Sequence, residues 1–344
     1  MFDGRTVLVT GGTGSFGKKA VQVILEHYKP RKLIVFSRDE LKQFEMAQKF
    51  RPAKYPCLRY FLGDVRDRDR LTRAFDGVDY VIHAAALKQV PAAEYNPSEF
   101  VKTNVLGAIN IIDAALQTNV KKVVALSTDK ACNPINLYGA TKLCSDKLFI
   151  AGNVYSGYRE TCFSVVRYGN VLGSRGSVVP FFKERAQTGV LPITDAKMTR
   201  FWITLDQAVH FVIRAMELMR GGEIFVPRIP SMKITDLATA IAPEAGQEIV
   251  GIRPGEKLHE TLISVDDARN AVAFKECFVI QAEPNARAAL TAEGKGKPCA
   301  EGFSYTSDSN SDWMTVAQLR ELVDQIADDY AIEQSRWAME DVPK

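Results

Sequence analysis

The sequence lacks long apolar runs. No such run approaches the roughly 18 residues that a membrane-spanning helix needs, and the first residues, MFDGRTVLVTGG, contain no basic segment followed by an apolar core. These absences argue against a membrane span and against a secretion signal. We therefore expect a soluble, cytoplasmic protein.

Paired cysteines and clustered histidines are missing as well. The six cysteines include no CxxC pair, and they have no metal-like spacing with the four histidines. The pattern predicts no metal site, and it is typical of thiols in a reducing compartment.

An excess of charge is the third absence. The chain has 44 basic and 41 acidic residues, a net charge of +3, which argues against nucleic acid or a membrane surface as a partner. Any anionic ligand must therefore be held by local geometry.

The first half of the chain alternates short apolar runs with amphipathic stretches. Strands are predicted at 6–10, 32–36, 58–63, 79–85, 121–127 and 162–168, and helices fill most of the gaps, for example 97–117 and 138–155. Apolar strands that alternate with helices indicate a parallel sheet covered on both faces. We predict an α/β fold with a Rossmann-type doubly wound parallel sheet.

The rhythm changes after residue 169. Residues 1–169 are predicted to form the dinucleotide-binding domain. Residues 170–344, richer in glycine, proline and isolated arginines, are predicted to form mainly a smaller C-terminal substrate-binding lobe. A helix near 204–219 should return to the first domain. The polar segment 283–312 is predicted to be loop or extended chain, and a last helix is expected near 315–329.

A glycine-rich loop joins the first predicted strand to the first predicted helix. The sequence VTGGTGSFGKKAVQVILE places Gly11, Gly14 and Gly17 there. Glycines at such a turn let the backbone approach a pyrophosphate, and the following helix N-terminus attracts the anion. Because the pattern follows a strand and opens a helix, it favours a dinucleotide-binding loop over a glycine turn without a ligand.

The end of the second predicted strand indicates which dinucleotide binds. NAD sites usually carry an acid here that binds both ribose hydroxyls, whereas this chain has Ser37 and Arg38. A hydroxyl and a guanidinium suit a 2′-phosphate, so NADP is favoured over NAD. Asp39 and Glu40 are expected to cap the next helix near its positive end.

Further cofactor contacts are expected after the third and fourth strands. Asp64 and Val65 would flank the adenine, Ala84 would let the backbone pass close to the cofactor, and Lys88 would meet a phosphate or the substrate. The full predicted cofactor set is Gly11, Thr13, Gly14, Ser15, Phe16, Gly17, Ser37, Arg38, Asp39, Glu40, Leu41, Lys42, Asp64, Val65, Ala84, Lys88, Asn104, Tyr138 and Lys142.

The segment STDKACNPINLYGATK, residues 127–142, carries the predicted chemistry. Tyr138 and Lys142 are four residues apart and so share one helix face. The charge of the lysine lowers the pKa of the phenol, so a tyrosinate can take a hydroxyl proton as hydride leaves the same carbon. Thr128 could hydrogen-bond the same oxygen. A simple alcohol dehydrogenase needs only the Tyr–Lys pair, and Asp129 and Lys130 remain to be explained.

With these motifs the sequence resembles the extended short-chain dehydrogenase/reductase superfamily. More narrowly, GGTGSFGK, SRDELKQ, GDVRD, HAAALKQVPAAEYNP, STDKACNPINLYGATK, RYGNVLGSRGSVVPFF, MTRFWIT and RPGEKLHE resemble the inverting UDP-N-acetylglucosamine 4,6-dehydratases, over nearly the whole chain. Those enzymes act first in making pseudaminic acid, a sugar used on bacterial flagella and surfaces.

The resemblance implies roles for the additional acid and base. A 4,6-dehydratase oxidises C4 of the sugar, eliminates water across C5 and C6, and reduces C6. By similarity Lys130 is the base at C5 and Asp129 is the acid for the departing hydroxyl, while Tyr138 and Lys142 serve the oxidation. Lysine is a base only when it is neutral, so the pKa of Lys130 must be lowered by burial or by Lys142. The retaining relatives carry Asp–Glu at these two positions.

Substrate contacts are also implied by the resemblance. Asn170 would meet the sugar or the diphosphate, and Lys88 is shared with the cofactor. Arg200, Arg253 and Glu256 would hold the uridine diphosphate and its ribose. A guanidinium binds phosphate oxygens in a fork, which suits a diphosphate.

Three alternatives are weighed against this interpretation. A dehydratase that also epimerises, in another UDP-deoxy-amino sugar pathway, often has methionine in place of Tyr138. A 4-epimerase has no use for Asp129 with Lys130. A catalytically silent NADP-binding subunit would be expected to lose Tyr138, Lys142 or Lys130. The superfamily resemblance also implies at least a homodimer through the helices near 97–117 and 138–155.

Overall fold

The computed structural model describes residues 1–173, 178–281, 283–292 and 296–325. By their internal contacts the residues fall into two compact units. Unit 1 consists of Met1–Asn170, Leu205–Arg228 and Thr261–Thr306, and unit 2 of Val171–Thr204, Ile229–Glu260 and the chain from Ser307 onward. The segment Thr261–Thr306, which the sequence places in the smaller lobe, therefore belongs to unit 1.

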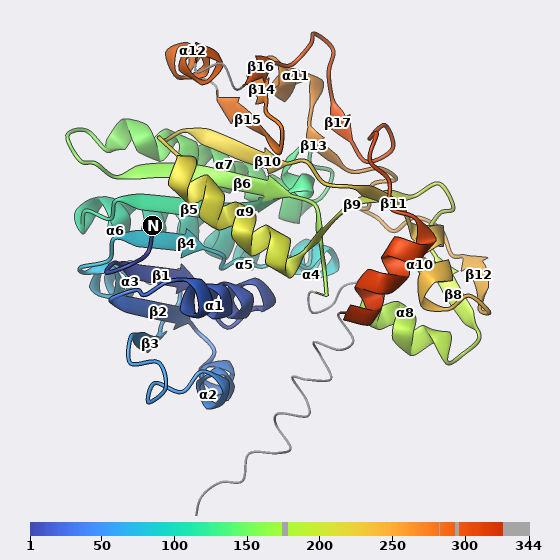
Figure 1. Cartoon of the computed structure of the whole chain (residues 1–344), viewed down its shortest axis with the longest axis horizontal. Helices are drawn as coiled ribbons and strands as arrows, with labels where there is room; N and C mark the ends of the chain where they lie inside the picture. Colours follow the sequence, from blue (N-terminus) through green and yellow to red (C-terminus); the bar gives the residue numbers. More distant parts are fainter. Residues whose placement is uncertain (174–177, 282, 293–295, 326–344) are drawn as a thin grey trace, which may run out of the picture. The chain divides into compact units, whose positions relative to one another are not determined.

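Unit 1 is built on one ten-stranded sheet (Figure 1). Seven strands run parallel in the order β3-β2-β1-β4-β5-β6-β10. Reversal of the strand order beside β1 is the doubly wound arrangement, and it places a ligand crevice at the carboxyl ends of β1 and β4. The bounds are β1 Thr6–Thr10, β2 Lys32–Ser37, β3 Leu58–Leu62, β4 Tyr80–His83, β5 Lys122–Thr128, β6 Cys162–Tyr168 and β10 Glu223–Pro227.

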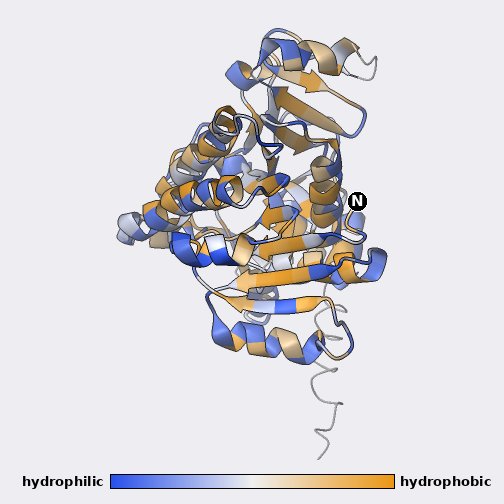
Figure 2. Ribbon diagram, turned by 90° about the vertical axis from the view of Figure 1, so that its left-hand side faces the viewer, coloured by the Kyte–Doolittle hydropathy of each residue, from blue (hydrophilic) through white to orange (hydrophobic). Residues whose placement is uncertain are grey.

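The six strands predicted for the first half are all confirmed, and five of them lie inside the sheet, while β3 forms its edge. β1 is buried along its whole length. Figure 2 shows the strands as a largely apolar layer, with polar residues on the outer sides of the covering helices.

Three antiparallel strands extend the sheet beyond β10. These are β15 (Cys277–Gln281), β14 (Ala271–Ala273) and β16 (Lys297–Pro298). Their pairing explains why this segment joins unit 1.

The prediction of loop or extended chain over 283–312 is wrong for α12 (Pro284–Ala292), an alanine-rich helix without a buried residue. Two short strands, β13 (Thr261–Ile263) and β17 (Tyr305–Thr306), form a separate pair.

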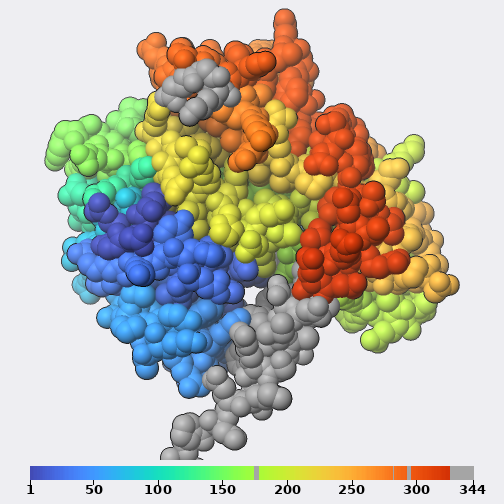
Figure 3. Space-filling view, viewed as in Figure 1, coloured from blue at the N-terminus to red at the C-terminus, as the bar shows by residue number. Residues whose placement is uncertain are grey.

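Helices cover both faces of the sheet. α1 (Ser15–His27) lies beside α9 (Leu205–Leu218), as the blue and yellow segments of Figure 3 show. The other layer contains α3 (Arg68–Phe75), α6 (Gly107–Gln117) and α7 (Leu137–Tyr155). The remaining helices of unit 1 are α2 (Glu40–Lys49), α4 (Val90–Tyr95), α5 (Pro97–Phe100) and α11 (Val265–Ala268).

The helix predicted over 97–117 contains an irregularity. α5 continues into a π-helical turn, η1 (Val101–Leu106), and then into α6. Such turns are rare and occur mostly at functional sites. Here the turn carries Asn104.

Unit 2 is smaller and has its own apolar core. It contains α8 (Val178–Ala186), α10 (Ile234–Ile241), a helix at 316–325, and paired strands β8 (Val190–Ile193) and β12 (Gly246–Ile249). β9 (Thr199–Thr204) pairs with β11 (Ser231–Lys233), and β7 (Asn170–Leu172) starts at the unit boundary. Phe182, Leu191, Trp202 and Leu237 are at the centre of the core. The last helix was predicted over 315–329, and residues 326–329 lie outside the described part.

In the part of the chain that the structure describes, no helix has the length and apolar character needed to cross a membrane.

Candidate active site

The glycine loop between β1 and α1 has the geometry of a dinucleotide-binding turn. Gly11 has a φ of 64°, and a Cβ atom there would lie 2.8 Å from the amide nitrogen of Ala85, so glycine lets the two backbones meet. At Gly17 a Cβ atom would lie 2.5 Å from the Cα atom of Gly12. Helix α1 therefore packs directly on the loop.

The start of α1 fits an anion. Its N-cap, Gly14, provides no side-chain hydrogen bond, and the nearest atom to a Cβ placed there is the Gly11 carbonyl oxygen at 3.2 Å. The first amides of a helix need an acceptor and carry a partial positive charge. A pyrophosphate at this position would supply that acceptor.

The end of β2 is joined to the glycine loop. Thr13 Oγ1 and Ser37 Oγ are 2.7 Å apart and both side chains are buried. Arg38 extends from the same strand end with its side chain 54% exposed, and its Nη1 lies 3.7 Å from Asp64 Oδ2. An arginine that is paired only loosely and reaches solvent is available to a phosphate.

Asp39 is the N-cap of α2, which confirms the expected capping role. Its carboxylate accepts a hydrogen bond from the Lys42 amide at 3.0 Å, and Lys42 Nζ lies 2.7 Å away. The hydrogen bonds from Lys42 lower the pKa of Asp39. Glu40 is in the first helical turn, and Leu41 is exposed.

Asp64 is held by two arginines. Arg66 donates to Asp64 Oδ2 at 2.8 Å and from its backbone to Oδ1 at 3.0 Å. Burial works to raise the pKa of Asp64, but the hydrogen bonds and charge of Arg66, helped by Arg38, outweigh it and lower the pKa. Val65 is buried beside it.

Asn104 connects the segment after β4 to the catalytic helix. Its side chain binds both the amide and the carbonyl of Leu87, each at 2.9 Å, and donates to Thr141 Oγ1 at 3.1 Å. The side-chain amide of Asn104 therefore binds other parts of the protein. Its partner Leu87 directly precedes Lys88 in the sequence. The pKa of Lys88 is lowered by burial and by the charge of Lys130.

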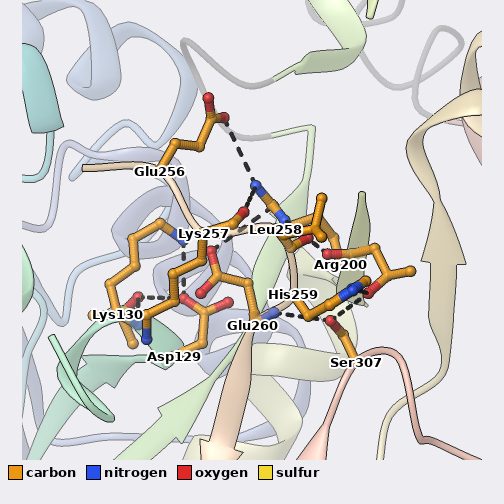
Figure 4. A network of polar contacts seen from close by, with 11 residues as sticks. Asp129, Lys130, Arg200, Glu256, Lys257, Leu258, His259, Glu260 and Ser307 are labelled. Carbon is orange, nitrogen blue, oxygen red and sulfur yellow. Dashed lines mark hydrogen bonds and ion pairs between the residues drawn. The ribbon is translucent and has the colours of Figure 1, made fainter. Parts of the chain in front are cut away.

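The structure brings Thr128, Asp129 and Lys130 together at the end of β5. Asp129 and Lys130 begin the 3-10 turn η2 (Asp129–Ala131), and Lys130 Nζ lies 3.0 Å from Asp129 Oδ1. Thr128 Oγ1 donates to the same oxygen at 2.9 Å. The Asp129 side chain is 1% exposed and that of Lys130 is 25% exposed. The pair, drawn in Figure 4, is therefore shielded on its acidic side and open on its basic side.

Tyr138 faces this turn from α7. Burial raises the pKa of Tyr138 to about 12, while the charge of Lys130 and a hydrogen bond with Thr128 lower it. The sequence assigns a lowering charge to Lys142, which stays a prediction, and Lys130 adds a second positive charge near the phenol. Lys142 itself is 3% exposed. Burial lowers the pKa of Lys142, and the charge of Asp146 raises it.

Arg200 of unit 2 organises the segment 256–260 (Figure 4). Its guanidinium donates to the carbonyl oxygens of Thr199, Lys257 and Leu258 at 2.7, 3.0 and 3.1 Å. Glu256 and Glu260 lie 3.7 and 3.8 Å from it. Arg253 is exposed on the turn that precedes Glu256. In unit 1, Asn170 has a buried Oδ1 without a hydrogen-bond partner among the described residues.

Two buried charged residues near this site were missed in the sequence. Asp146 lies one helical turn after Lys142, and Arg167 interrupts the apolar run of β6. Both signals were present: helical spacing for the first, and a charge inside a buried strand for the second.

The glycine loop after β1, the doubly wound sheet and the Tyr138–Lys142 helix after β5 define a short-chain dehydrogenase/reductase of the extended type. The family described as polysaccharide biosynthesis protein matches residues 7–282. A UDP-N-acetylglucosamine 4,6-dehydratase (inverting) from Campylobacter jejuni is 56% identical over 331 residues, 94% of this chain and 98% of that protein. The chain therefore belongs to this family of dehydratases, which are hydro-lyases, and the resemblance seen in the sequence is confirmed.

Solved structures agree with the fold. Pen from Bacillus thuringiensis is 36% identical with a TM-score of 0.85, covering 95% of this chain and 99% of that chain. DesIV, a dTDP-glucose 4,6-dehydratase from Streptomyces venezuelae with NAD and TYD bound, is 25% identical with a TM-score of 0.65, covering 74% and 86%. The predicted Rossmann-type fold is thereby confirmed.

Proposed function

We propose that this protein catalyses the NADP-dependent 4,6-dehydration of UDP-N-acetylglucosamine with inversion at C5. The product would be UDP-2-acetamido-2,6-dideoxy-β-L-arabino-hex-4-ulose. The observation that carries the proposal is the Asp129–Lys130 pair, 3.0 Å apart and beside Tyr138. The 56% identity to dehydratases of this name supports it.

NADP is proposed as the cofactor because of the residues at the end of β2. The glycine loop would hold its pyrophosphate, and Ser37 and Arg38 would hold a 2′-phosphate. Asp39 is occupied as a helix cap by Lys42, so it is poorly placed to bind two ribose hydroxyls as an NAD-type acid does. A bound nicotinamide ring supplies the acceptor and later the donor of one hydride.

Oxidation at C4 requires a base for the hydroxyl proton. Tyr138 would take this proton as tyrosinate, and Thr128 would share the hydrogen bond to the phenol oxygen. Because burial raises the pKa of Tyr138 to about 12, the ionised form needs a nearby positive charge. Lys130 would supply that charge before it gives its proton to Asp129, and Lys142 would bind the nicotinamide ribose and assist.

Elimination requires a base at C5 and an acid at the C6 hydroxyl. Lys130 as an ammonium and Asp129 as a carboxylate are both in the wrong form for these tasks. Transfer of one proton along their 3.0 Å hydrogen bond yields an amine and a carboxylic acid. Burial favours this neutral form, and Asp129 is almost fully buried. One internal proton transfer would thus prepare both groups.

Contacts to the substrate are proposed residue by residue. In unit 1, Lys88 and Asn170 would contact the sugar or the diphosphate. In unit 2, Arg253 would bind the diphosphate, and Arg200 would bind it or fix the segment that does, while Glu256 would bind the ribose.

The wider setting is also a proposal. We propose that the protein catalyses the first step of pseudaminic acid synthesis. The pseudaminic acid would then be used in flagellin glycosylation. A homo-oligomer of at least two subunits and a cytoplasmic location stay predictions.

The test is incubation of the protein with UDP-N-acetylglucosamine and NADP, with the product analysed by NMR. An L-arabino 4-keto sugar, formed without net consumption of reduced cofactor, is expected. A product changed only at C4 would indicate a 4-epimerase. A 4-keto sugar of another configuration would favour the alternative, a dehydratase/epimerase of another UDP-deoxy-amino sugar pathway.

A further inference from the structure

Four charged side chains of unit 1 form a buried series in which the signs alternate. They are Lys142 and Asp146 on α7, Arg167 on β6 and Asp267 on α11. The first three are 3%, 1% and 2% exposed, and the Asp267 side chain is 28% exposed. Of the four, only Lys142 belongs to the predicted site.

Arg167 connects the two carboxylates. Its Nη2 lies 3.6 Å from Asp146 Oδ2, and its Nη1 donates to Asp267 Oδ2 at 2.9 Å and to the Leu262 carbonyl at 3.1 Å. Ser127 donates to Asp146 Oδ2 at 2.7 Å. A buried carboxylate stays ionised only when it is paired and hydrogen-bonded. Burial raises the pKa of Asp146, and the charge of Arg167, the charge of Lys142 and the hydrogen bond from Ser127 act against that rise, so these contacts favour the ionised carboxylate.

Asp267 also contacts the segment that follows the Asp129–Lys130 turn. The buried thiol of Cys132 lies 3.7 Å from Asp267 Oδ2, and Cys132 directly follows η2. Ser264 Oγ accepts a hydrogen bond from the Asp267 amide at 3.0 Å, and this bond fixes the start of α11. The far end of the charge series is therefore anchored.

Asp146 lies one helical turn after Lys142 on α7, a spacing at which two side chains are neighbours. Burial lowers the pKa of Lys142, and within the described residues Asp146 is the charge that raises it. His83 on β4 adds none, because burial and the charge of Lys142 lower its pKa to about 3. The remaining titratable or charged groups around these residues are Tyr138 of α7, Tyr168 of β6, and Asp129 and Lys130 of η2.

We propose that Asp146 is a positioning residue that keeps Lys142 protonated, and that Arg167, anchored on Asp267, keeps Asp146 ionised. Lys142 can then hold a positive charge in a place where an unpaired ammonium would lose its proton. The consequence for turnover rests on the proposed function, in which this ammonium contacts the cofactor ribose and assists Tyr138.

The test is a direct titration of Lys142 in the full-length protein, with and without NADP. The protein is labelled with ¹³Cε-lysine, and the Lys142 signal is assigned by its loss in Lys142→Met. Asp146→Asn keeps the size of the side chain and removes its charge. The midpoint of Lys142 should fall by about 1 pH unit or more, and Asp146→Glu should restore most of the shift.

Two further variants separate charge from structure. Asp267→Asn, at a more exposed and more distant carboxylate, should lower the midpoint by less than Asp146→Asn and remains informative if the latter does not fold. Ser127→Ala removes one hydrogen bond without a charge and should shift it least. An unchanged midpoint in Asp267→Asn and in any folded Asp146→Asn protein overturns the proposal.

The same variants distinguish this inference from the proposed function. The basic limb of the pH profile for product formation should move to lower pH together with the Lys142 midpoint. A loss of activity that is uniform over pH, with an unchanged midpoint, assigns Asp146 a structural role only and overturns the inference. If the midpoint moves but no UDP-sugar is converted, the inference stands and the proposed function fails.

Discussion

Gly139 and Lys130 meet backbone to backbone. A Cβ atom at Gly139 would overlap the carbonyl oxygen of Lys130, so no other residue lets α7 approach the turn η2 so closely. This contact fixes the distance between the phenol of Tyr138, one residue earlier, and the Asp129–Lys130 pair. Glycine usually weakens a helix interior, and here the close approach explains its presence.

Gly139→Ala should therefore reduce both activity and stability. Alanine gains about 1 kcal/mol of helix propensity, but its methyl group displaces the backbone of the turn that carries Lys130, and that displacement outweighs the gain. We expect a loss of 100-fold or more in kcat, at about 1.4 kcal/mol per tenfold, with a thermal midpoint below that of the wild type. Product formation and thermal unfolding are measured together.

Gly152→Ala, on the same helix, is the matched control. A Cβ atom there would meet Phe163 at 3.2 Å and Ile112 at 3.3 Å, both contacts with side chains and neither with backbone. Its activity should stay near that of the wild type. If Gly139→Ala is equally active, the backbone contact does not position the site.

Lys130→Ala should abolish dehydration and leave some oxidation at C4. The reason is that the proposed base acts only in the second step, so reduced cofactor should accumulate in a single turnover. Loss of the Lys130 charge also raises the pKa of Tyr138 further, so the residual oxidation should need a higher pH than in the wild type. Absorbance of the reduced nicotinamide measures both effects.

Asp129→Asn should be as severe, because an amide cannot donate a proton to the leaving hydroxyl. Lys29→Ala, at an exposed loop lysine, is the control and should leave every step unchanged. A Lys130→Ala protein that forms product at a near wild-type rate would remove Lys130 from the mechanism.

Arg38→Ala should weaken NADP binding and affect NAD little. A hydrogen bond to a charged group is worth about 1.5–3 kcal/mol, so the ratio of the two affinities should change roughly 10- to 100-fold. Arg68→Ala removes an arginine of similar exposure that is paired with Asp113 and should change neither affinity. Equal losses for NADP and NAD in Arg38→Ala would show that Arg38 does not contact a 2′-phosphate.

Arg200→Lys should lower both UDP affinity and the stability of the protein. Lysine cannot reach the three carbonyl oxygens that the guanidinium of Arg200 binds, and each unsatisfied buried group costs about 1–3 kcal/mol. Arg253→Ala, at an exposed position, should lower UDP affinity alone. Calorimetry measures the affinity for UDP, and thermal unfolding measures the stability, so the two effects are separated. A stable Arg200→Lys protein with unchanged UDP affinity would refute both roles of Arg200.

Local sequence signals were sufficient for the strands, the glycine loop and the segment 127–142. Each of these depends on residues that are neighbours in the chain. The pairing of Arg167 with Asp267 was not predictable, because these residues are a hundred positions apart and meet only after β6 and α11 are placed. The role of Asn104 was also hidden, since its partners Leu87 and Thr141 lie on two other segments. The sequence analysis also did not predict that β14, β15 and β16 extend the sheet, because their pairing again joins segments that are distant in the chain.

The last prediction concerns the proton at C5. Inversion requires that the proton removed by Lys130 leaves one face of C5 and that a proton exchanged with water arrives on the opposite face, so Lys130 does not return its own proton. When the reaction is run in heavy water, the product should carry deuterium at C5, and NMR should show the L-arabino configuration in freshly formed material. Lys130→Arg is the control, since a guanidinium keeps the charge and does not act as a base; it should bind UDP-N-acetylglucosamine without exchange at C5. A product with protium at C5 would contradict delivery of a solvent-derived proton, and a D-xylo product would contradict inversion while leaving the dehydration intact.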